Sequence, residues 1–345
     1  MSVSAGVDLK LDWDIQEDPE KLGPFEERIA KGELVEADDW MPHNYRVGML
    51  RMAEHHANSE IVGALPEGEW ITRAPTLRRK LALIAKVQDE VGHGQMLYRV
   101  SQDLGKPRDQ MLRDLITGKT KYHNVFNYPA PTWADVVMIQ WLVDGAAIMN
   151  QATLADGSYG PYVRTMKRIN MEEAFHFKSG EDMVLTMMSG TPKQKQMAQE
   201  AFDRWWGPCL MFFGPLDKES VKTSPFMRWR IKTATNDDLR QRFVDRFAPA
   251  ALDLGLRIHV TVKDESGMVN ERREDTEIRR DANAGHWRFT QPDWSEFYRV
   301  VKGNGPLNKK RVGLRRFSYE QGQWVRRAVL GECGSPPESC NMVGR

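Results

Sequence analysis

Two Glu-x-x-His motifs are the residues of this 345-residue chain whose types and spacing could do chemistry. Glu90 and His93 form the first motif, and Glu173 and His176 form the second. This spacing places both side chains on one face of a helix, where a carboxylate and an imidazole can bind one divalent cation. A single pair of this kind is more often solvated or hydrogen-bonded in a core, so one motif alone is weak evidence for a metal site.

The surroundings of the first motif are repeated around the second. Glu60 lies 30 residues before Glu90, and Asp144 lies 29 residues before Glu173. Each half of the chain therefore reads as a carboxylate, a helix reversal and a Glu-x-x-His motif. Four carboxylates and two imidazoles that converge inside a four-helix bundle are the arrangement of di-iron carboxylate proteins.

Burial makes metal ions the expected partners of these side chains. Four buried, unpaired carboxylates would cost more free energy than the net stability of a domain, which is about 5–15 kcal/mol. The pattern therefore predicts a pair of divalent cations, and oxygen-rich ligands with one imidazole per metal suit iron or manganese better than zinc. The predicted ligands are Glu60, Glu90, His93, Asp144, Glu173 and His176.

Lys86 stands one helical turn before Glu90 and is expected to point toward the same cluster. An ammonium group beside ligating carboxylates could relay protons or hold a ligand away from the metal. A partly buried salt bridge explains the same spacing equally well, so both roles stay open.

The other histidines carry a weaker signal. His55 and His56 are assigned no carboxylate at ligand spacing, and they are interpreted as residues of the core or of a substrate channel. The remaining four, which are interpreted as structural, are His43, His123, His259 and His286.

Composition excludes several classes of protein. A chain with 41% hydrophobic and 28% charged residues has the profile of a soluble globular protein, and a net charge of +1 argues against binding nucleic acid or an anionic membrane. The sequence has no run of about 18 apolar residues and no secretory signal, so we expect a cytoplasmic protein. Three scattered cysteines fit neither a zinc site nor a disulfide framework.

Periodicity and punctuation predict helices that can position the motifs. Helices are expected over residues 43–64, 76–104, 132–154 and 161–189, followed by others from residue 191 and over 235–255. Thr132 and Asp135 have the spacing of a capping box at the third of these. No convincing strand hairpin precedes residue 256, so the fold class is predicted to be all-α.

The first helix pair presents a mismatch. Glu60 lies about 5 residues before the proline-rich break and Glu90 about 15 residues after it, which is roughly 15 Å of difference along the helix axes. We therefore expect residues 65–75 to form an extended connection that spans this distance.

Longer phrases resemble one family. They are SEIVGALPEGEWITRAPTLRRK (59–80), KVQDEVGHGQ (86–95), WWGPCLMFFGPLD (205–217), TNDDLRQRFVDRFAPAALDLGL (235–256) and DWSEFYRVVKGNGP (293–306). All of them resemble the iron-bearing oxygenase subunits of bacterial ring-1,2-phenylacetyl-CoA epoxidases, which are multicomponent monooxygenases. The resemblance extends over residues 40–330 approximately.

The resemblance implies a ferritin-like fold and oxygen activation at two irons, with one oxygen atom inserted into the aromatic ring of phenylacetyl-CoA. The six predicted ligands match the family's ligand positions, and Lys86 with Glu67 match residues that form a hydrogen-bonded lid near the iron. The implied organisation is an N-terminal arm (1–40), a ferritin-like di-iron bundle (41–256) and an irregular C-terminal extension (257–345) for CoA or partner contacts.

Electrons must come from another polypeptide, because the sequence shows no flavin or nicotinamide fingerprint and no iron–sulfur cysteine set. The resemblance implies a reductase that carries flavin and an iron–sulfur cluster and uses NADPH. It also implies, as partners, a ferritin-like structural subunit together with a small accessory subunit.

A CoA ester brings phosphates that need cations close to the channel mouth. We expect Lys121, on a loop between helices, to bind a phosphate and Arg51 to contact the inner part of the ligand. The basic stretch 302–327 is interpreted as a solvated or partner-docking tail, with the alternative that it covers the active site.

Three other functions are weighed. Nothing in the sequence marks the cage-forming surface of a ferritin-type iron store. A radical-generating ribonucleotide reductase subunit places a tyrosine four residues after the first His, where this chain has Leu97, and Tyr98 is one step too far. A metal-free scaffold subunit of the same complex would not keep all six ligands, which are present here and favour catalysis.

Overall fold

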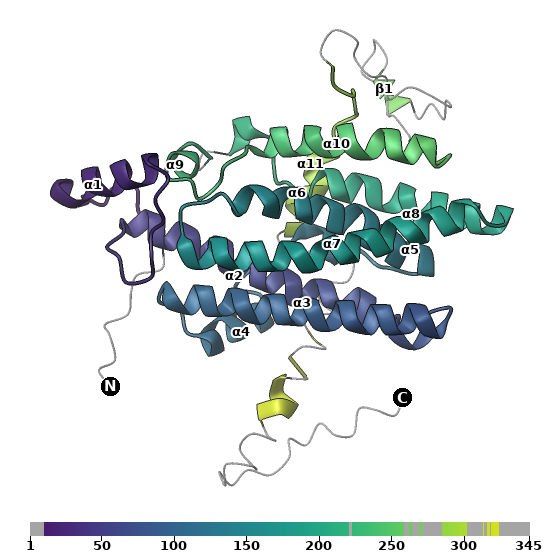
Figure 1. Cartoon of the computed structure of the whole chain (residues 1–345), viewed down its shortest axis with the longest axis horizontal. Coiled ribbons are helices and arrows are strands. Elements are labelled where there is room, and N and C mark those ends of the chain that lie inside the picture. The colour runs from purple at the N-terminus through teal and green to yellow at the C-terminus, as the bar shows by residue number, and fades with distance from the viewer. Residues whose placement is uncertain are drawn as a thin grey trace.

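Four helical stretches carry the two motifs and their partner carboxylates. The computed structural model describes residues 10–220, 223–258, 262–263, 269–270, 285–301, 313, 316–317 and 319–323. Helices α2 (His43–Gly68) and α3 (Leu77–Asp103) form the first antiparallel pair. The second pair consists of α7 (Gly160–Met188) and a continuous stretch made of α5 (Trp133–Met138), η3 (Ile139–Val143) and α6 (Asp144–Leu154). The predicted all-α, ferritin-like bundle is confirmed, and α3 and α7 run side by side along its length (Figure 1).

Local sequence signals fix where these helices begin. The Thr76 hydroxyl accepts a hydrogen bond from the backbone N–H of Arg79 at the start of α3. The Thr132 backbone N–H donates to the Asp135 carboxylate over 2.7 Å, as the predicted capping box requires. These side chains satisfy N–H groups that have no partner within the helix, so they set the start of each helix.

The connection between α2 and α3 differs from the prediction. Residues 65–75 are not extended, because α2 continues through Pro66 to Gly68 and a short 3₁₀ turn, η1 (Ile71–Arg73), follows it. A proline removes one helical hydrogen bond, but Pro66 and Glu67 are buried, and burial of this last turn offsets the loss. The longer α2 also reduces the mismatch expected between the two halves.

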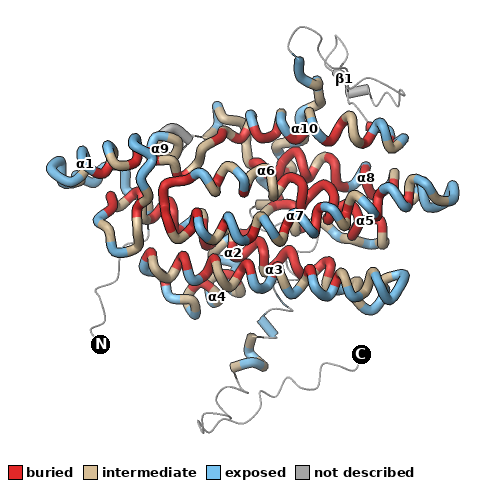
Figure 2. The backbone as a smooth tube through the Cα atoms, in the orientation of Figure 1, coloured by how far each residue is buried: buried red, intermediate tan, exposed pale blue. Residues whose placement is uncertain are grey.

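The remaining helices surround this bundle. They are α1 (Pro19–Ala30), α4 (Arg108–Ile116), η2 (Asn124–Asn127), α8 (Pro192–Leu210), η4 (Asp217–Glu219), α9 (Thr223–Arg228), α10 (Asn236–Asp253) and α11 (Trp294–Arg299). Two short antiparallel strands, β1 (Val262–Lys263) and β2 (Val269–Asn270), lie in the C-terminal part. Figure 2 shows that buried residues concentrate where α2, α5, α6, α7, α8 and α10 face one another.

The N-terminal segment is more ordered than its irregular sequence pattern indicates. Within residues 1–40, helix α1 buries Phe25 and Ile29, and the Phe25 ring meets Tyr45 of α2 edge-on at 5.0 Å. Val35 forms a parallel bridge with Tyr159 just before α7. Aromatic and apolar burial against the bundle therefore orders a segment that has no such partner in its own sequence.

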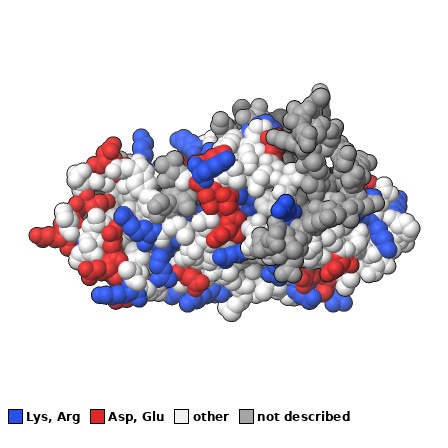
Figure 3. Space-filling view, turned by 90° about the horizontal axis from the view of Figure 1, so that it is seen from above, with Lys and Arg blue, Asp and Glu red and all other residues white. Residues whose placement is uncertain are grey.

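The C-terminal extension returns to the bundle. The Tyr128 hydroxyl donates to Glu296 over 2.9 Å, and the Trp287 N–H donates to Asp245 over 2.7 Å. Most of the basic stretch 302–327, including Lys309, Lys310 and Arg311, lies outside the described residues. Cationic and anionic side chains are interspersed on the face seen in Figure 3. Among the described residues, no helix is both long and apolar enough to cross a membrane.

Replacing Gly180 with Ala should destabilise the bundle. A Cβ atom at this position of α7 would lie 2.5 Å from the backbone carbon of Gln140 in η3, so the two helices would have to separate. We expect the free energy of unfolding to fall by about 1–3 kcal/mol, measured by chemical denaturation.

Gly92 provides the matched control, because a Cβ atom there would meet nothing within 4 Å. Gly92→Ala should stabilise the chain by up to about 1 kcal/mol through helix propensity. Equal effects of the two changes would contradict the close contact between α7 and η3.

Candidate metal centre

The structure brings all six predicted ligand residues together in the interior of the bundle. Each of them is at most 7% exposed. Their ligand atoms form two overlapping groups, within which all atoms lie less than 4.8 Å from one another. One group is Glu60, Glu90, His93 and Glu173, and the other is Asp144, Glu173 and His176. Glu173 belongs to both groups, so it occupies the centre of the cluster.

The inward-facing imidazole nitrogens indicate that a cation fits. The Nδ1 atom of His93 lies 3.4 Å from Glu173, 3.7 Å from Glu90 and 3.8 Å from Glu60. This buried nitrogen has no hydrogen-bond partner among the described residues. Ligand atoms that share a metal, each about 2 Å from it, lie about 3–4 Å apart, so these separations suit a shared ion. The group could therefore hold a metal ion.

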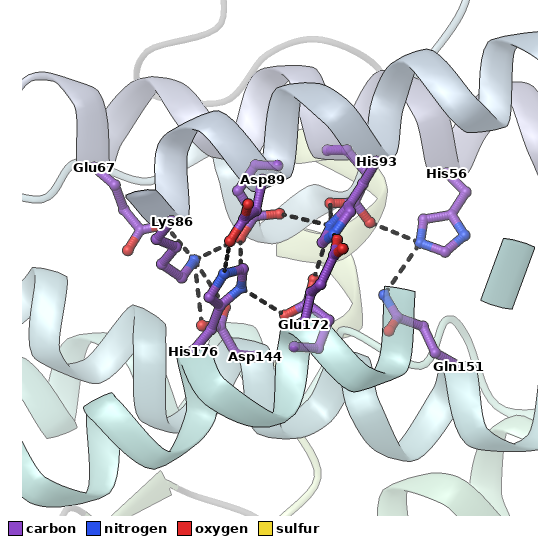
Figure 4. A network of polar contacts seen from close by, with 12 residues as sticks. His56, Glu67, Lys86, Asp89, His93, Asp144, Gln151, Glu172 and His176 are labelled. Carbon is purple, nitrogen blue, oxygen red and sulfur yellow. Dashed lines mark hydrogen bonds and ion pairs between the residues drawn. The ribbon is translucent and has the colours of Figure 1, made fainter. Parts of the chain in front are cut away.

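The outward-facing imidazole nitrogens are held by two carboxylates that sequence reasoning missed. Nε2 of His93 lies 2.8 Å from Glu172 of α7, and Nε2 of His176 lies 3.0 Å from Asp89 of α3 (Figure 4). An acceptor at Nε2 fixes the proton there and leaves Nδ1 free for a cation. A signal was present, since an acid stands immediately before the Glu of each motif.

A π-helical segment positions Asp144. The five residues of η3 end directly before Asp144, which begins α6. A π turn holds more residues than an α turn and so rotates the following helix face relative to the preceding one. The hydrophobic pattern of residues 132–154 predicts one uninterrupted helix and gives no sign of this rotation.

Lys86 joins the cluster through three carboxylates. Its Nζ atom lies 2.5 Å from Glu67, 2.7 Å from Glu90 and 3.2 Å from Asp144. Burial favours the neutral amine, but these three carboxylates outweigh it and raise the pKa of Lys86 well above its usual value. Gln140 of η3 donates to the second Glu67 oxygen over 3.0 Å. A buried salt bridge is therefore present, and the expected pairing of Lys86 with Glu67 occurs.

Burial and neighbouring charge act differently on the four carboxylates. Burial raises the pKa of Glu60, and it raises the pKa of Asp144 well above the usual range. Burial also acts on Glu90, but the Lys86 ammonium and a hydrogen bond with His93 outweigh it and hold that pKa well below its usual value. A bound cation would favour the charged form of each carboxylate, because opposite charge opposes the cost of burial.

A cavity opens beside the cluster. It encloses about 710 Å³ of empty space, part of which is open to solvent, and Glu60, Glu90, Asp144 and Glu173 line one side of it. The opposite wall is mainly apolar and includes Met52, Phe126, Ile139, Val143, Ala147, Leu154 and Phe212. A second cavity of about 770 Å³ shares six lining residues with the first and is also lined by Lys232, Phe297 and Val301. The C-terminal segment thus contributes to the outer wall.

Two histidines lie where the two cavities meet. His55 and His123 line both of them, and the His123 ring stacks on Phe212 at 3.8 Å. Burial lowers the pKa of His55 to about 4, so the ring stays neutral near pH 7. The channel interpretation of His55 fits this position. The structural interpretation of His123 is incomplete, because its ring also faces the cavity.

The residues expected to bind CoA lie outside the cavity walls. Arg51 and Lys121 are exposed and do not line either cavity. Arg51 is one helical turn before His55, and the Lys121 charge is close enough to contribute to the lowered pKa of His55. Both cations are therefore near the residues at which the two cavities meet.

His56 has a carboxylate partner that the sequence interpretation did not assign. Its Nε2 atom lies 2.8 Å from Glu60, one turn further along α2. The spacing of four residues was readable in the sequence, but a spacing of this kind also joins many exposed pairs.

Known proteins were compared once this geometry was established. Residues 16–324 match the family described as phenylacetic acid catabolic protein. The chain belongs to this family. It is 46% identical over 306 residues to the 1,2-phenylacetyl-CoA epoxidase protein of Escherichia coli (strain K12) that is designated the A component, and the match covers 89% of this chain and 94% of that protein. The family resemblance noted in the sequence is therefore confirmed, and the match extends into the N-terminal segment and past α11.

Metal analysis tests the cluster directly. After anaerobic loading with Fe(II) and removal of free metal, the chain should retain about two irons. Glu173→Ala should retain far less, because Glu173 belongs to both groups of ligand atoms.

Asp182→Ala is the control, since Asp182 is an exposed carboxylate on the same helix and pairs only with Lys178 among the described residues. It should bind iron as the wild type does. Normal iron content in Glu173→Ala would refute the proposed position of the metal centre.

Proposed function

We propose that this chain is the oxygenase subunit of a multicomponent monooxygenase that converts phenylacetyl-CoA to its ring-1,2-epoxide in aerobic phenylacetate degradation. The observation that carries the proposal is the buried cluster of six predicted ligands beside a cavity with an apolar wall. The similarity to one subunit of a phenylacetyl-CoA epoxidase supports the choice of substrate. The overall reaction takes one substrate, O₂, two electrons and two protons to one epoxide and one water.

The proposed cofactor is a pair of iron ions. Glu60, Glu90, His93, Asp144, Glu173 and His176 would hold it, in agreement with the donor atoms that the cluster offers. When bound, iron supplies the activation of dioxygen that an inert aromatic ring requires. The two electrons come from a separate reductase with flavin and an iron–sulfur cluster, which oxidises NADPH.

The chain's own residues bind and orient the substrate. The aromatic ring occupies the inner cavity against the apolar wall, where burial excludes water from the reacting carbons. The CoA arm leaves past the neutral rings of His55 and His123 into the outer cavity. Lys121 and Arg51, near the residues at which the cavities meet, bind the phosphates and the inner part of CoA.

The domain organisation follows this division of work. Residues 41–256 form the metal-binding bundle, and residues 257–345 form the extension that reaches CoA or a partner. Phe297 and Val301 support this role for the extension, because both line the outer cavity. Residues 1–40 remain assigned as an arm that packs on the bundle.

A ferritin-like structural subunit, together with a small accessory subunit, completes the proposed complex, whose place is the cytoplasm. The name of the E. coli relative supports partners in general, because it describes that protein as one subunit of an enzyme. The alternative of a metal-free scaffold subunit fits less well, since all six ligand residues are present and buried. A radical-generating function is disfavoured because Leu97 is buried where that family has its tyrosine.

Reconstitution tests this function. The iron-loaded chain, combined with its structural subunit, the reductase, NADPH and phenylacetyl-CoA, should incorporate one atom of ¹⁸O from ¹⁸O₂ into the CoA ester, as detected by mass spectrometry. Absence of an oxygenated ester from the complete, iron-loaded system would reject the proposal.

Lys86→Gln should separate a catalytic role from a structural one. If the ammonium holds or moves a proton beside Glu67 and Glu90, turnover should fall at least about tenfold with iron content and fold retained. The comparison uses rates measured on iron-loaded protein, with Lys80→Gln on the same helix as the control. Unchanged turnover would leave Lys86 with the role of a buried salt bridge.

Lys121→Glu should weaken the binding of phenylacetyl-CoA without disturbing iron. The Michaelis constant should rise and become less sensitive to salt, because a charge pair with a phosphate is lost. Lys119→Glu, an equally exposed change on the same loop, is the control. Normal binding by Lys121→Glu, with weaker binding after changes at Lys309, Lys310 and Arg311, would place the C-terminal segment over the active site instead.

A further inference from the structure

A chain of hydrogen bonds enters the cluster from the end opposite Lys86. His56 lies on α2 one turn before Glu60, and its Nε2 atom is 2.8 Å from Oε1 of that carboxylate. Its Nδ1 atom is 2.9 Å from the hydroxyl of Tyr162 on α7. Figure 4 shows His56 and Gln151 at one end of the polar network, with Glu67 and Lys86 at the other. The contact thus joins the two helix pairs of the bundle.

The donors and acceptors in this chain can be assigned from their chemistry. An ionised Glu60 carboxylate only accepts, so Nε2 of His56 carries the proton and donates it. Nδ1 then accepts from the Tyr162 hydroxyl, which remains protonated because burial raises the pKa of this tyrosine. Gln151 approaches the same Nε2 atom at 3.3 Å, and with Nε2 protonated the amide must present its oxygen to the ring.

Glu60 needs such a donor more than the other carboxylates do. Lys86 makes ion pairs with Glu67, Glu90 and Asp144, and Glu60 is not among its partners in the described part of the chain. With Oε1 engaged by His56, the other oxygen, Oε2, lies 3.8 Å from Nδ1 of His93 inside the cluster. One oxygen is therefore tied to the imidazole while the other faces the candidate metal.

We propose that His56 is a positioning residue that turns Glu60 so that only Oε2 reaches the metal, and that Tyr162 fixes the His56 tautomer needed for this. The inference rests on the proposed function, because it takes Glu60 to be a ligand. Neither His56 nor Tyr162 lies at ligand spacing in the Glu-x-x-His motifs, so their role follows from contacts between helices. An outer hydrogen bond of this kind typically changes metal affinity about 10- to 100-fold when it is lost.

The test uses Co²⁺ as a probe, because its visible absorption reports ligand geometry without turnover. The metal-free chain is titrated with Co²⁺, and binding is measured by equilibrium dialysis and by the visible spectrum. His56→Leu removes the donor at similar volume and should weaken one of the two Co²⁺ ions by about tenfold or more, with an altered spectrum. His56→Gln retains an N–H at the same distance along the side chain and should stay within about threefold of the wild type.

Two further variants complete the experiment. His55→Gln is the control for the same helix and cavity wall, since the His55 ring meets His123 rather than a predicted ligand. It should leave Co²⁺ affinity and spectrum unchanged. Tyr162→Phe removes only the hydroxyl and should weaken Co²⁺ binding to a degree between that of His56→Gln and that of His56→Leu.

Specific results would overturn the role of His56. They are wild-type affinity and spectrum in a folded His56→Leu variant, or a His56→Gln variant as weak as His56→Leu, which would indicate packing alone. If circular dichroism shows that His56→Leu does not fold, Tyr162→Phe decides, and wild-type affinity in that variant rejects the proposal. Failure of the wild-type chain to bind two Co²⁺ ions would instead refute the proposed metal centre.

Discussion

The burial of several carboxylates in one small volume is the constraint on which the rest of this structure depends. Charged groups taken out of water cost free energy, and like charges held within a few ångströms add to that cost. Glu173, which belongs to both groups of ligand atoms, experiences this most directly. The bundle is stable only because each carboxylate has a positive or hydrogen-bonding partner, or takes up a proton or a cation.

Those partners are divided among different parts of the cluster. Lys86 supports Glu67, Glu90 and Asp144 at one end, and His56 supports Glu60 at the other. On the outer side, carboxylates hold the two imidazoles of the motifs in the tautomer that frees Nδ1. The interior thus offers its ligand atoms in a fixed orientation before any ion arrives, which reduces the reorganisation that binding requires.

The same scaffold separates the metal cluster from the route by which a substrate enters. The apolar wall formed by α2, α6 and Phe212 leaves room for a flat, apolar group next to the cluster. Neutral histidines and then Lys232 mark a change from apolar to polar surroundings toward the outside. An acyl-CoA has this polarity along its length, with an apolar acyl end and a charged nucleotide end, which is why the fold suits such a ligand.

The sequence alone determined the helices, their caps and the six converging residues, because helix spacing fixes which side chains share a face and Glu-x-x-His is local. It did not determine the continuation of α2 through Pro66, the π segment before Asp144 or the order of α1, since each depends on burial against distant parts of the chain. The exchange of partners between Asp89, Glu172 and the two motif histidines was equally hidden. Contacts between helices are set by how whole helix faces pack, and only the tertiary structure decides that.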